Sequence, residues 1–196
     1  PVAMALVSFT VLTTWRRGRR LLLEEMARQT FPLADFIGTI GDVHRVHGTA
    51  IFMTSAKEGV PSALLHNLKH NQVLHDRVVL LTVQTANSPL VNDLDRLYLR
   101  RLDEGFVRII IRYGFMEDPD IPAALEQCAR FGETFDMMET TFYVSREVVI
   151  PRIPGRDIAP WRARLFALMS KNATSATDFF KIPTNRVVEL GTQLVL

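Results

Sequence analysis

The sequence TAIFMTSAKEGVPSALLHNLKHNQVLHDRVVLLTV occupies residues 49–83 and contains three segments of different character. The first and last segments, residues 49–54 and 78–83, are compact apolar runs beside turn residues, a pattern that indicates strands buried on both faces. Residues 62–70, between them, carry leucines at helical spacing. A strand, a helix and a second strand so close in sequence predict a βαβ unit, and this unit requires a parallel pair of strands.

Segments on either side extend this unit. Upstream, residues 33–40 have the spacing of a short amphipathic helix, and residues 41–48 resemble a loop. Downstream, apolar runs at 97–102 and 106–113 flank a turn that contains Gly105, which predicts a β-hairpin. The remaining segments predict a helix, a strand, a helix and a strand, at residues 122–131, 141–149, 159–169 and 187–196. The expected fold class is α/β, a mixed β-sheet with a βαβ unit, a β-hairpin and flanking helices.

Residues 1–15, PVAMALVSFTVLTTW, carry no charged side chain and end at a tryptophan. As a helix they would be about 22 Å long, whereas the hydrocarbon core of a bilayer is about 30 Å thick. Four arginines follow at once: Arg16, Arg17, Arg19 and Arg20. Positive charge beside an apolar span favours the cytoplasmic side of a membrane, and tryptophan favours the interface. We therefore expect the end of a transmembrane helix whose remainder lies upstream. A buried helix of a soluble protein is the alternative.

Composition excludes several classes of function. The net charge is +2, from 23 basic and 21 acidic residues, and this balance does not favour nucleic-acid binding. A hydrophobic content of 47% is typical of a folded domain. Cys128 is the only cysteine, so an internal disulfide and a multi-cysteine zinc site are excluded.

The sequence contains no group of residues with the spacing of a catalytic or metal site. His66 and His70 are four apart on one predicted helix and could share a metal, but no further ligand accompanies them. Cys128 falls on an apolar helix face and is expected to be buried. Asp118 and Asp120 are expected to favour the start of a helix. We therefore assign no catalytic, cofactor-binding or metal-binding residue and expect no enzyme activity.

The loop at residues 54–59 follows the first buried strand and leads into a helix. In α/β folds, phosphate groups bind at such positions, where a strand ends and a helix begins. This loop has a single glycine, Gly59, and matches neither the dinucleotide fingerprint nor the Walker sequence. A regulatory small-molecule site and a plain connecting loop are both compatible with it.

Six short stretches, spread in order along the chain, together resemble a known protein family. They are TTWRRGR at 13–19, GTAIFMT at 48–54, PSALLHNLKHN at 61–71, RYGFME at 112–117, NATSATDFF at 172–180 and PTNRVVELG at 183–191. Together, these stretches resemble the KUP (KUP/HAK/KT) family of potassium-uptake transporters, especially its bacterial members. Each stretch alone is weak evidence for the family. Because the stretches occur in order and span the chain from end to end, the resemblance is specific.

The resemblance implies the C-terminal portion of a multi-pass protein of the cell inner membrane that takes up potassium, coupled to protons. Its ion site would lie in upstream helices, so no transport residue falls in this chain. Residues 1–30 would be the end of the last transmembrane helix with its cytoplasmic extension. Residues 31–196 would be a cytoplasmic domain with a regulatory or structural role.

The partners implied by the resemblance are the upstream membrane domain, the lipid bilayer, potassium and protons. A homodimer and a regulatory nucleotide are left open, and no nucleic acid is expected. The alternative function is a membrane-attached regulatory module that binds a nucleotide at the loop of residues 54–59.

Overall fold

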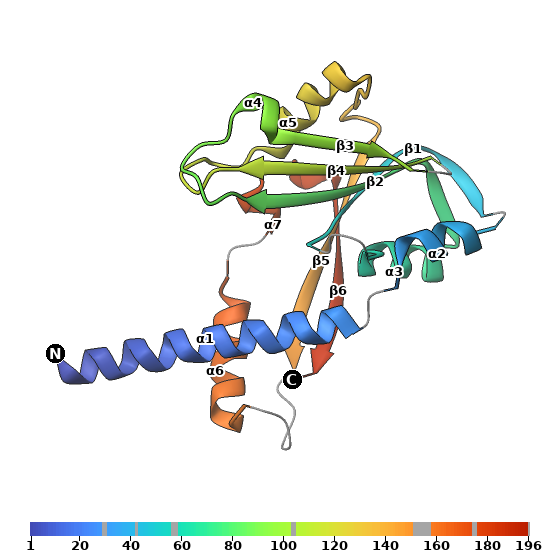
Figure 1. The fold of residues 1–196 in the computed structure, drawn as a ribbon. Helices are drawn as coiled ribbons and strands as arrows, with labels where there is room; N and C mark the ends of the chain where they lie inside the picture. Colours follow the sequence, from blue (N-terminus) through green and yellow to red (C-terminus); the bar gives the residue numbers. More distant parts are fainter. Residues whose placement is uncertain are drawn as a thin grey trace. The chain divides into compact units, whose positions relative to one another are not determined.

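The computed structural model describes residues 1–28, 31–41, 43–55, 59–102, 105–150, 158–173 and 176–195 (Figure 1). The chain divides into two compact units. The helix-pair unit comprises Pro1–Thr30, Arg146–Thr174 and Gly191–Leu196, and the sheet unit comprises Phe31–Ser145 and Ser175–Leu190.

The six-stranded sheet has the strand order β3-β4-β2-β1-β5-β6. Its strands are β1 His44–Met53, β2 Val73–Thr85, β3 Leu97–Arg101, β4 Phe106–Tyr113, β5 Thr140–Ile150 and β6 Val187–Val195. β1 pairs in parallel with β2 and with β5, and β2 pairs in parallel with β4, whereas β3 and β4 are antiparallel. The predicted βαβ unit and the predicted hairpin are therefore confirmed. Residues 103 and 104 of the hairpin turn lie outside the described residues.

The α-helices are α1 Val2–Arg28, α2 Leu33–Thr39, α3 Ser62–Asn71, α4 Asp93–Arg96, α5 Ile121–Glu126, α6 Pro160–Lys171 and α7 Ala176–Phe179. Two 3-10 helices are η1 Gln127–Phe131 and η2 Thr184–Arg186. Proline stands in the first turn of α5 and of α6, where its missing N–H removes no helical hydrogen bond. η1 ends at Gly132, whose φ of 77° lies in the left-handed region that glycine adopts without strain.

Both faces of the sheet unit are covered, so successive residues of a central strand are buried on opposite sides. Ile51 of β1 and Leu81 of β2 belong to the core beneath α5. Phe52 and Leu80, one residue away in each strand, belong to the core beneath α2 and α3. All four side chains are fully buried. This arrangement explains why the apolar runs of β1 and β2 show no polar alternation.

The expected loop at residues 41–48 is wrong for residues 44–48, which form the first half of β1. His44 pairs in parallel with Val73 of β2, and a register shift separates this half of β1 from its apolar half. Gly48, at φ +108°, lies in that irregular stretch. These side chains are mostly polar and partly exposed, so pairing with β2 rather than apolar burial forms the strand. No hydrophobic pattern therefore indicates it.

In the helix-pair unit, α1 and α6 pack through a contact that centres on Phe166 of α6. The Phe166 ring is fully buried and lies 5.5 Å from the ring of Trp15, measured between ring centroids. A Cβ atom on Gly18 would overlap the Phe166 ring, so the missing side chain permits this close approach. Leu22, one turn further along α1, completes the contact.

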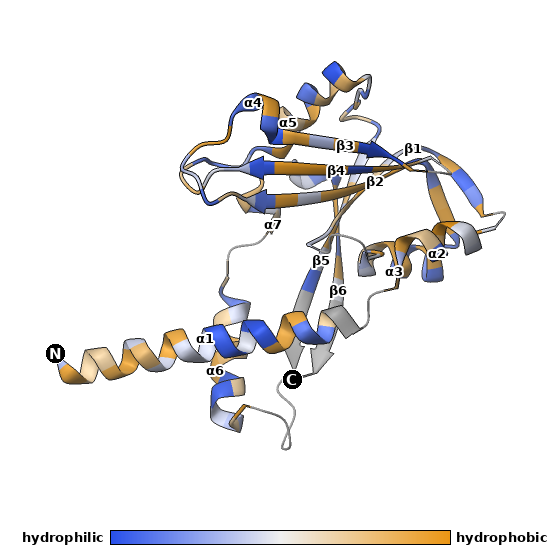
Figure 2. Ribbon diagram, in the orientation of Figure 1, coloured by the Kyte–Doolittle hydropathy of each residue, from blue (hydrophilic) through white to orange (hydrophobic). Residues whose placement is uncertain are grey.

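The exposed surface of α1 changes from apolar to basic along the helix (Figure 2). Leu6, Phe9 and Leu12, in its first half, are each 66–67% exposed. Exposed arginines follow Trp15. Among the described residues, no helix combines the length and the apolar content that a membrane crossing needs. The transmembrane part of the expected fold is therefore not shown by this structure.

Replacing Leu80 with alanine tests the position of the sheet core. Leu80 is fully buried in β2, between β1 and β4, so Leu80→Ala should lower the free energy of unfolding by about 2–5 kcal/mol. Urea unfolding of the chain in mild detergent measures this change. The matched control is Leu94→Ala, because Leu94 is 81% exposed and should lose little stability. Equal effects of the two substitutions would contradict the assigned core.

Candidate functional site

The carboxyl ends of β1, β2 and β4 meet at one edge of the sheet unit, because these strands are parallel. From β1 the chain crosses to β2 on one side, and β5 later pairs with β1 on the other side. The carboxyl end of β1 therefore lies at a topological switch point. α/β folds commonly bind ligands at such a point. The sequence-predicted loop at residues 54–59 begins here: the Thr54 N–H donates to the Leu81 carbonyl at 2.9 Å. Residues 56–58 of that loop lie outside the described residues.

Hydroxyl groups lie beside this loop at the switch point. The Ser62 Oγ, in the first turn of α3, is 3.0 Å from the Ser145 Oγ of β5. Next to them, the rings of Phe52 and Tyr143 stack with centroids 4.6 Å apart. These groups could hydrogen-bond a polar ligand, and the first turn of α3 presents backbone N–H groups.

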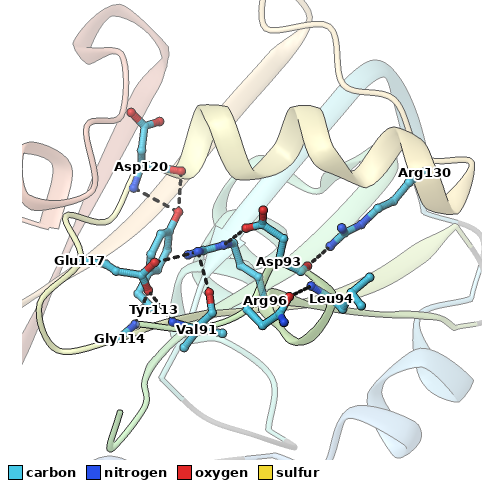
Figure 3. Close-up of polar contacts among 10 residues, drawn as sticks. Val91, Asp93, Leu94, Arg96, Tyr113, Gly114, Glu117, Asp120 and Arg130 are labelled. Atoms are coloured by element: carbon cyan, nitrogen blue, oxygen red, sulfur yellow. Dashed lines mark hydrogen bonds and ion pairs between the residues drawn. The ribbon is translucent and has the colours of Figure 1, made fainter. Parts of the chain in front are cut away.

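At the carboxyl end of β4, the protein's own side chains fill the edge (Figure 3). Arg96 Nη2 donates to Glu117 Oε1 at 2.7 Å and to the Val91 carbonyl at 3.0 Å, and Arg96 Nε donates to Asp93 Oδ1 at 3.2 Å. The guanidinium also lies over the Tyr113 ring, 5.2 Å from its centroid. One arginine thus joins the segment before α4 to the segment after β4.

The Arg96–Glu117 pair is largely buried, with side chains 12% and 15% exposed. Its electrostatics follow from this geometry. The hydrogen bond from Arg96, and a second from the Gly114 N–H, lower the pKa of Glu117. The hydrogen bond with Glu117 raises the pKa of Arg96. Both groups are therefore charged at neutral pH, and the pair stabilises the loop that follows β4.

A second hydrogen-bonded group follows in the chain. The Tyr113 hydroxyl donates to the Asp120 carbonyl at 2.6 Å and accepts from the Asp120 N–H at 3.1 Å, and burial raises its pKa. Asp120 Oδ1 accepts from the Ala123 N–H at 3.0 Å and so caps α5. The predicted capping role of Asp120 is confirmed, whereas no cap is seen for Asp118.

Two further arginines share one carboxylate elsewhere in the sheet unit. Arg101 Nε donates to Glu133 Oε1 at 2.6 Å, and Arg77 pairs with the other oxygen of Glu133. Arg77 also stacks on the Phe135 ring at 4.2 Å. Glu133 is 8% exposed, so this triad has a structural role in fixing η1 and the following segment against the sheet.

The histidines include His66 and His70, which the sequence places four apart on one helix as a pair that could share a metal. The rings of His66 and His70 stack on α3 with centroids 5.8 Å apart. His47 lies 3.6 Å from Asp76 and 3.4 Å from Glu139, on a surface where its side chain is 81% exposed. Within the described ranges, no three histidine, cysteine or acidic side chains are placed to hold a metal ion.

Cys128 is fully buried, as predicted, and its thiol donates to the Ala124 carbonyl at 3.7 Å. Burial raises the pKa of the Cys128 thiol to about 11. A thiol with this pKa carries almost no thiolate at neutral pH, so Cys128 contributes packing rather than reactivity.

Sequence reasoning missed two sets of ion pairs, that of Arg96 with Glu117 and those of Glu133 with Arg77 and Arg101. Arg96 and Glu117 are 21 residues apart, and Arg77 and Glu133 are 56 apart. Neither separation is a helical or hairpin spacing. The available signal is an acidic residue, Glu117, four positions after the end of a predicted hairpin strand, in RYGFME at residues 112–117.

The fold and this edge define a mixed-sheet α/β domain joined to a separate helix pair. The sequence pattern of the K+ potassium transporter C-terminal domain matches residues 47–196, and the chain belongs to this family. The chain is 71% identical over 196 residues to probable potassium transport system protein Kup 2 of Dechloromonas aromatica, covering 100% of this chain and 31% of that protein.

Similar proteins occur in other bacteria. A probable potassium transport system protein Kup of Rhodopseudomonas palustris is 56% identical, over 99% of this chain and 31% of its own length. Another, from Myxococcus xanthus, is 51% identical over 100% of this chain and 30% of its own length. The chain thus spans about a third of these relatives. No solved structure matches it.

Glu117→Gln tests the buried ion pair through its pH dependence. A carboxylate whose pKa is lowered by folding stabilises the folded state at neutral pH, and this contribution disappears as the pH falls through the lowered pKa. The unfolding free energy of Glu117→Gln should therefore be below that of the parent chain at pH 7. The difference should shrink below about pH 4. Urea unfolding at several pH values measures it.

Glu126→Gln is the matched control for this experiment, because Glu126 is exposed on α5. It should change the stability little at any pH. A loss in Glu117→Gln that is the same at acidic and neutral pH would contradict the charge-based role of the pair.

Proposed function

We propose that this chain is the cytoplasmic C-terminal domain of a potassium-uptake transporter, a K+/H+ symporter of the cell inner membrane. The family match and the printed names of the relatives support potassium transport. Those names indicate transport rather than catalysis. The ion pathway would lie in membrane helices upstream, near the bilayer midplane, so none of its residues belongs to this chain.

The observation that carries this proposal is the distribution of charge along α1. Residues 1–15 are uncharged, Trp15 stands at the boundary, and Arg16, Arg17 and Arg19 follow on the exposed surface. A transmembrane helix that enters the cytoplasm has this order. The first half of α1 would then be the end of the last transmembrane helix, and its second half the cytoplasmic extension.

The way in which the chain connects its two units supports a regulatory role. It passes between them after residues 30, 145, 174 and 190, and two of these passages lie within strands β5 and β6. A shift of the sheet unit would therefore act on the helix-pair unit through several covalent connections. A ligand can bias such a shift only by its different affinity for two states, with a coupling of typically 1–3 kcal/mol.

The second candidate function of this domain is a membrane-attached regulatory module that binds a nucleotide. Its support is that Thr54, where the loop at residues 54–59 begins, lies at the switch point, and that Ser62 lies in the first turn of α3. Thermal unfolding of the chain with and without nucleotides distinguishes the two functions. Stabilisation that Ser62→Asp abolishes would favour a nucleotide-binding module, since a carboxylate there repels phosphate.

Ending the full-length transporter after Met26 tests the regulatory role. Potassium uptake should persist, because the ion pathway is upstream, but its dependence on external potassium and pH should differ from that of the full-length protein. Uptake is measured at matched abundance in the membrane. Unchanged uptake under every condition would reduce the domain to a structural appendage. Complete loss despite normal insertion would make it part of the transport machinery, and either result would contradict regulation.

A further inference from the structure

The position at which α6 crosses α1 coincides with the change from apolar to basic surface on α1. Phe166 of α6 rests on Gly18 and against Trp15. Trp15 is the last uncharged residue of the first half, and exposed arginines flank Gly18 on either side. Figure 1 shows α6 running across α1 rather than along it. The contact is compact, because Gly18 carries no side chain that would hold the helices apart.

This crossing fixes the depth of α6 relative to a membrane. The inference rests on the proposed function, in which α1 leaves the bilayer near Trp15. Gly18 is about 5 Å beyond Trp15 along the helix axis, a distance within the headgroup layer, which extends about 5–8 Å beyond the hydrocarbon. A helix that crosses α1 there lies along the membrane surface, and lipid headgroups surround it laterally.

The outward face of α6 has the composition of an interfacial helix. Ala163 and Phe166 are buried, whereas Trp161, Arg164, Leu168 and Lys171 are exposed. Trp161 and Leu168 are 54% and 59% exposed. The four exposed residues follow at intervals of three, four and three, so they share one face. Tryptophan favours the membrane interface, and arginine and lysine at that level interact with anionic headgroups.

The surface of α1 beside the crossing adds positive charge. Arg16, Arg17 and Arg19 are exposed, and within the described part of the chain no acidic side chain forms an ion pair with them. Arg20 is 3.8 Å from Glu24 in an exposed pair. A shallow hollow on this helix is lined by Trp15, Arg16, Arg19, Arg20, Leu23 and Glu24. The guanidinium groups can hydrogen-bond the phosphate of a lipid headgroup, and the indole can contact the same lipid.

We propose that α6 is an interfacial helix that, together with the arginines of α1, binds anionic phospholipid headgroups at the membrane surface. The opposite charges of arginine and lysine and of the headgroups favour this occupant. The exposed apolar first half of α1 favours a bilayer over an acidic protein. Binding would hold α6 across α1 and so fix the orientation of the helix pair at the surface.

Tryptophan fluorescence in vesicles tests the proposal, because Trp15 and Trp161 are the only tryptophans. In a Trp15→Phe background, Trp161 alone reports on α6. The chain is reconstituted into vesicles of phosphatidylcholine, or of phosphatidylcholine and phosphatidylglycerol in equal parts. We expect a blue shift of Trp161 and quenching by lipids brominated near the headgroup, both stronger with phosphatidylglycerol and weakened by salt.

Two sets of variants separate charge from geometry. Arg164→Gln combined with Lys171→Gln should remove most of the preference for phosphatidylglycerol. Gly18→Ala should weaken quenching without changing the charge, because its Cβ displaces Phe166. Gly38→Ala is the matched control, since no atom lies within 4 Å of the added Cβ, and it should leave quenching unchanged.

The outcomes distinguish this inference from the function on which it rests. In a Trp161→Phe background, Trp15 reports on α1. Quenching of Trp15 without quenching of Trp161 would overturn the role of α6 and leave the membrane helix intact. Absence of both would overturn both proposals. Equal quenching in the two kinds of vesicle would exclude selectivity for anionic lipid, and a blue shift caused by inorganic phosphate alone would indicate a free-anion site instead.

Discussion

β1 is paired in parallel on both edges and buried on both faces along its apolar half, and the sheet unit depends on this placement. A parallel pair needs a crossover, which α3 provides between β1 and β2. The two apolar faces of the sheet each need helices packed on them. α2 and α3 pack on one face, and α5 packs on the other. The pairing with β5 on the second edge then creates the switch point where Ser62 and Ser145 meet.

The buried ion pairs stabilise the loops around this sheet rather than forming a reactive centre. Arg96 is held by Glu117, Asp93 and the Val91 carbonyl, so its Nε and Nη2 groups are engaged within the protein. The raised pKa of the Cys128 thiol likewise fits a packing role. The groups that suit a polar ligand lie instead at the switch point, beside a helix N-terminus. This arrangement is compatible with the regulatory role proposed above.

The sequence predicts those parts of the fold in which burial alone forms the element. The apolar halves of β1 and β2 are uncharged runs, and the hairpin combines two apolar segments with a glycine in its turn. The polar half of β1 escapes prediction because its partner is 29 residues away, at Val73. The Gly18–Phe166 contact and the Ser62–Ser145 contact escape for the same reason, since only the tertiary fold joins such distant residues. The βαβ pattern predicts that the chain at residues 54–59 connects a strand to a helix. It does not predict that Ser62 and Ser145 lie close together beside the start of this loop.

We propose that α1 leaves the membrane on the cytoplasmic side between Phe9 and Arg19. Single cysteines at these positions, in a full-length transporter otherwise free of cysteine, are treated with a membrane-impermeant maleimide in intact cells and in inverted membrane vesicles. We expect Arg19→Cys to be labelled only in inverted vesicles and Phe9→Cys to be labelled in neither preparation. Labelling of Arg19→Cys in intact cells, or of Phe9→Cys in inverted vesicles, would contradict it.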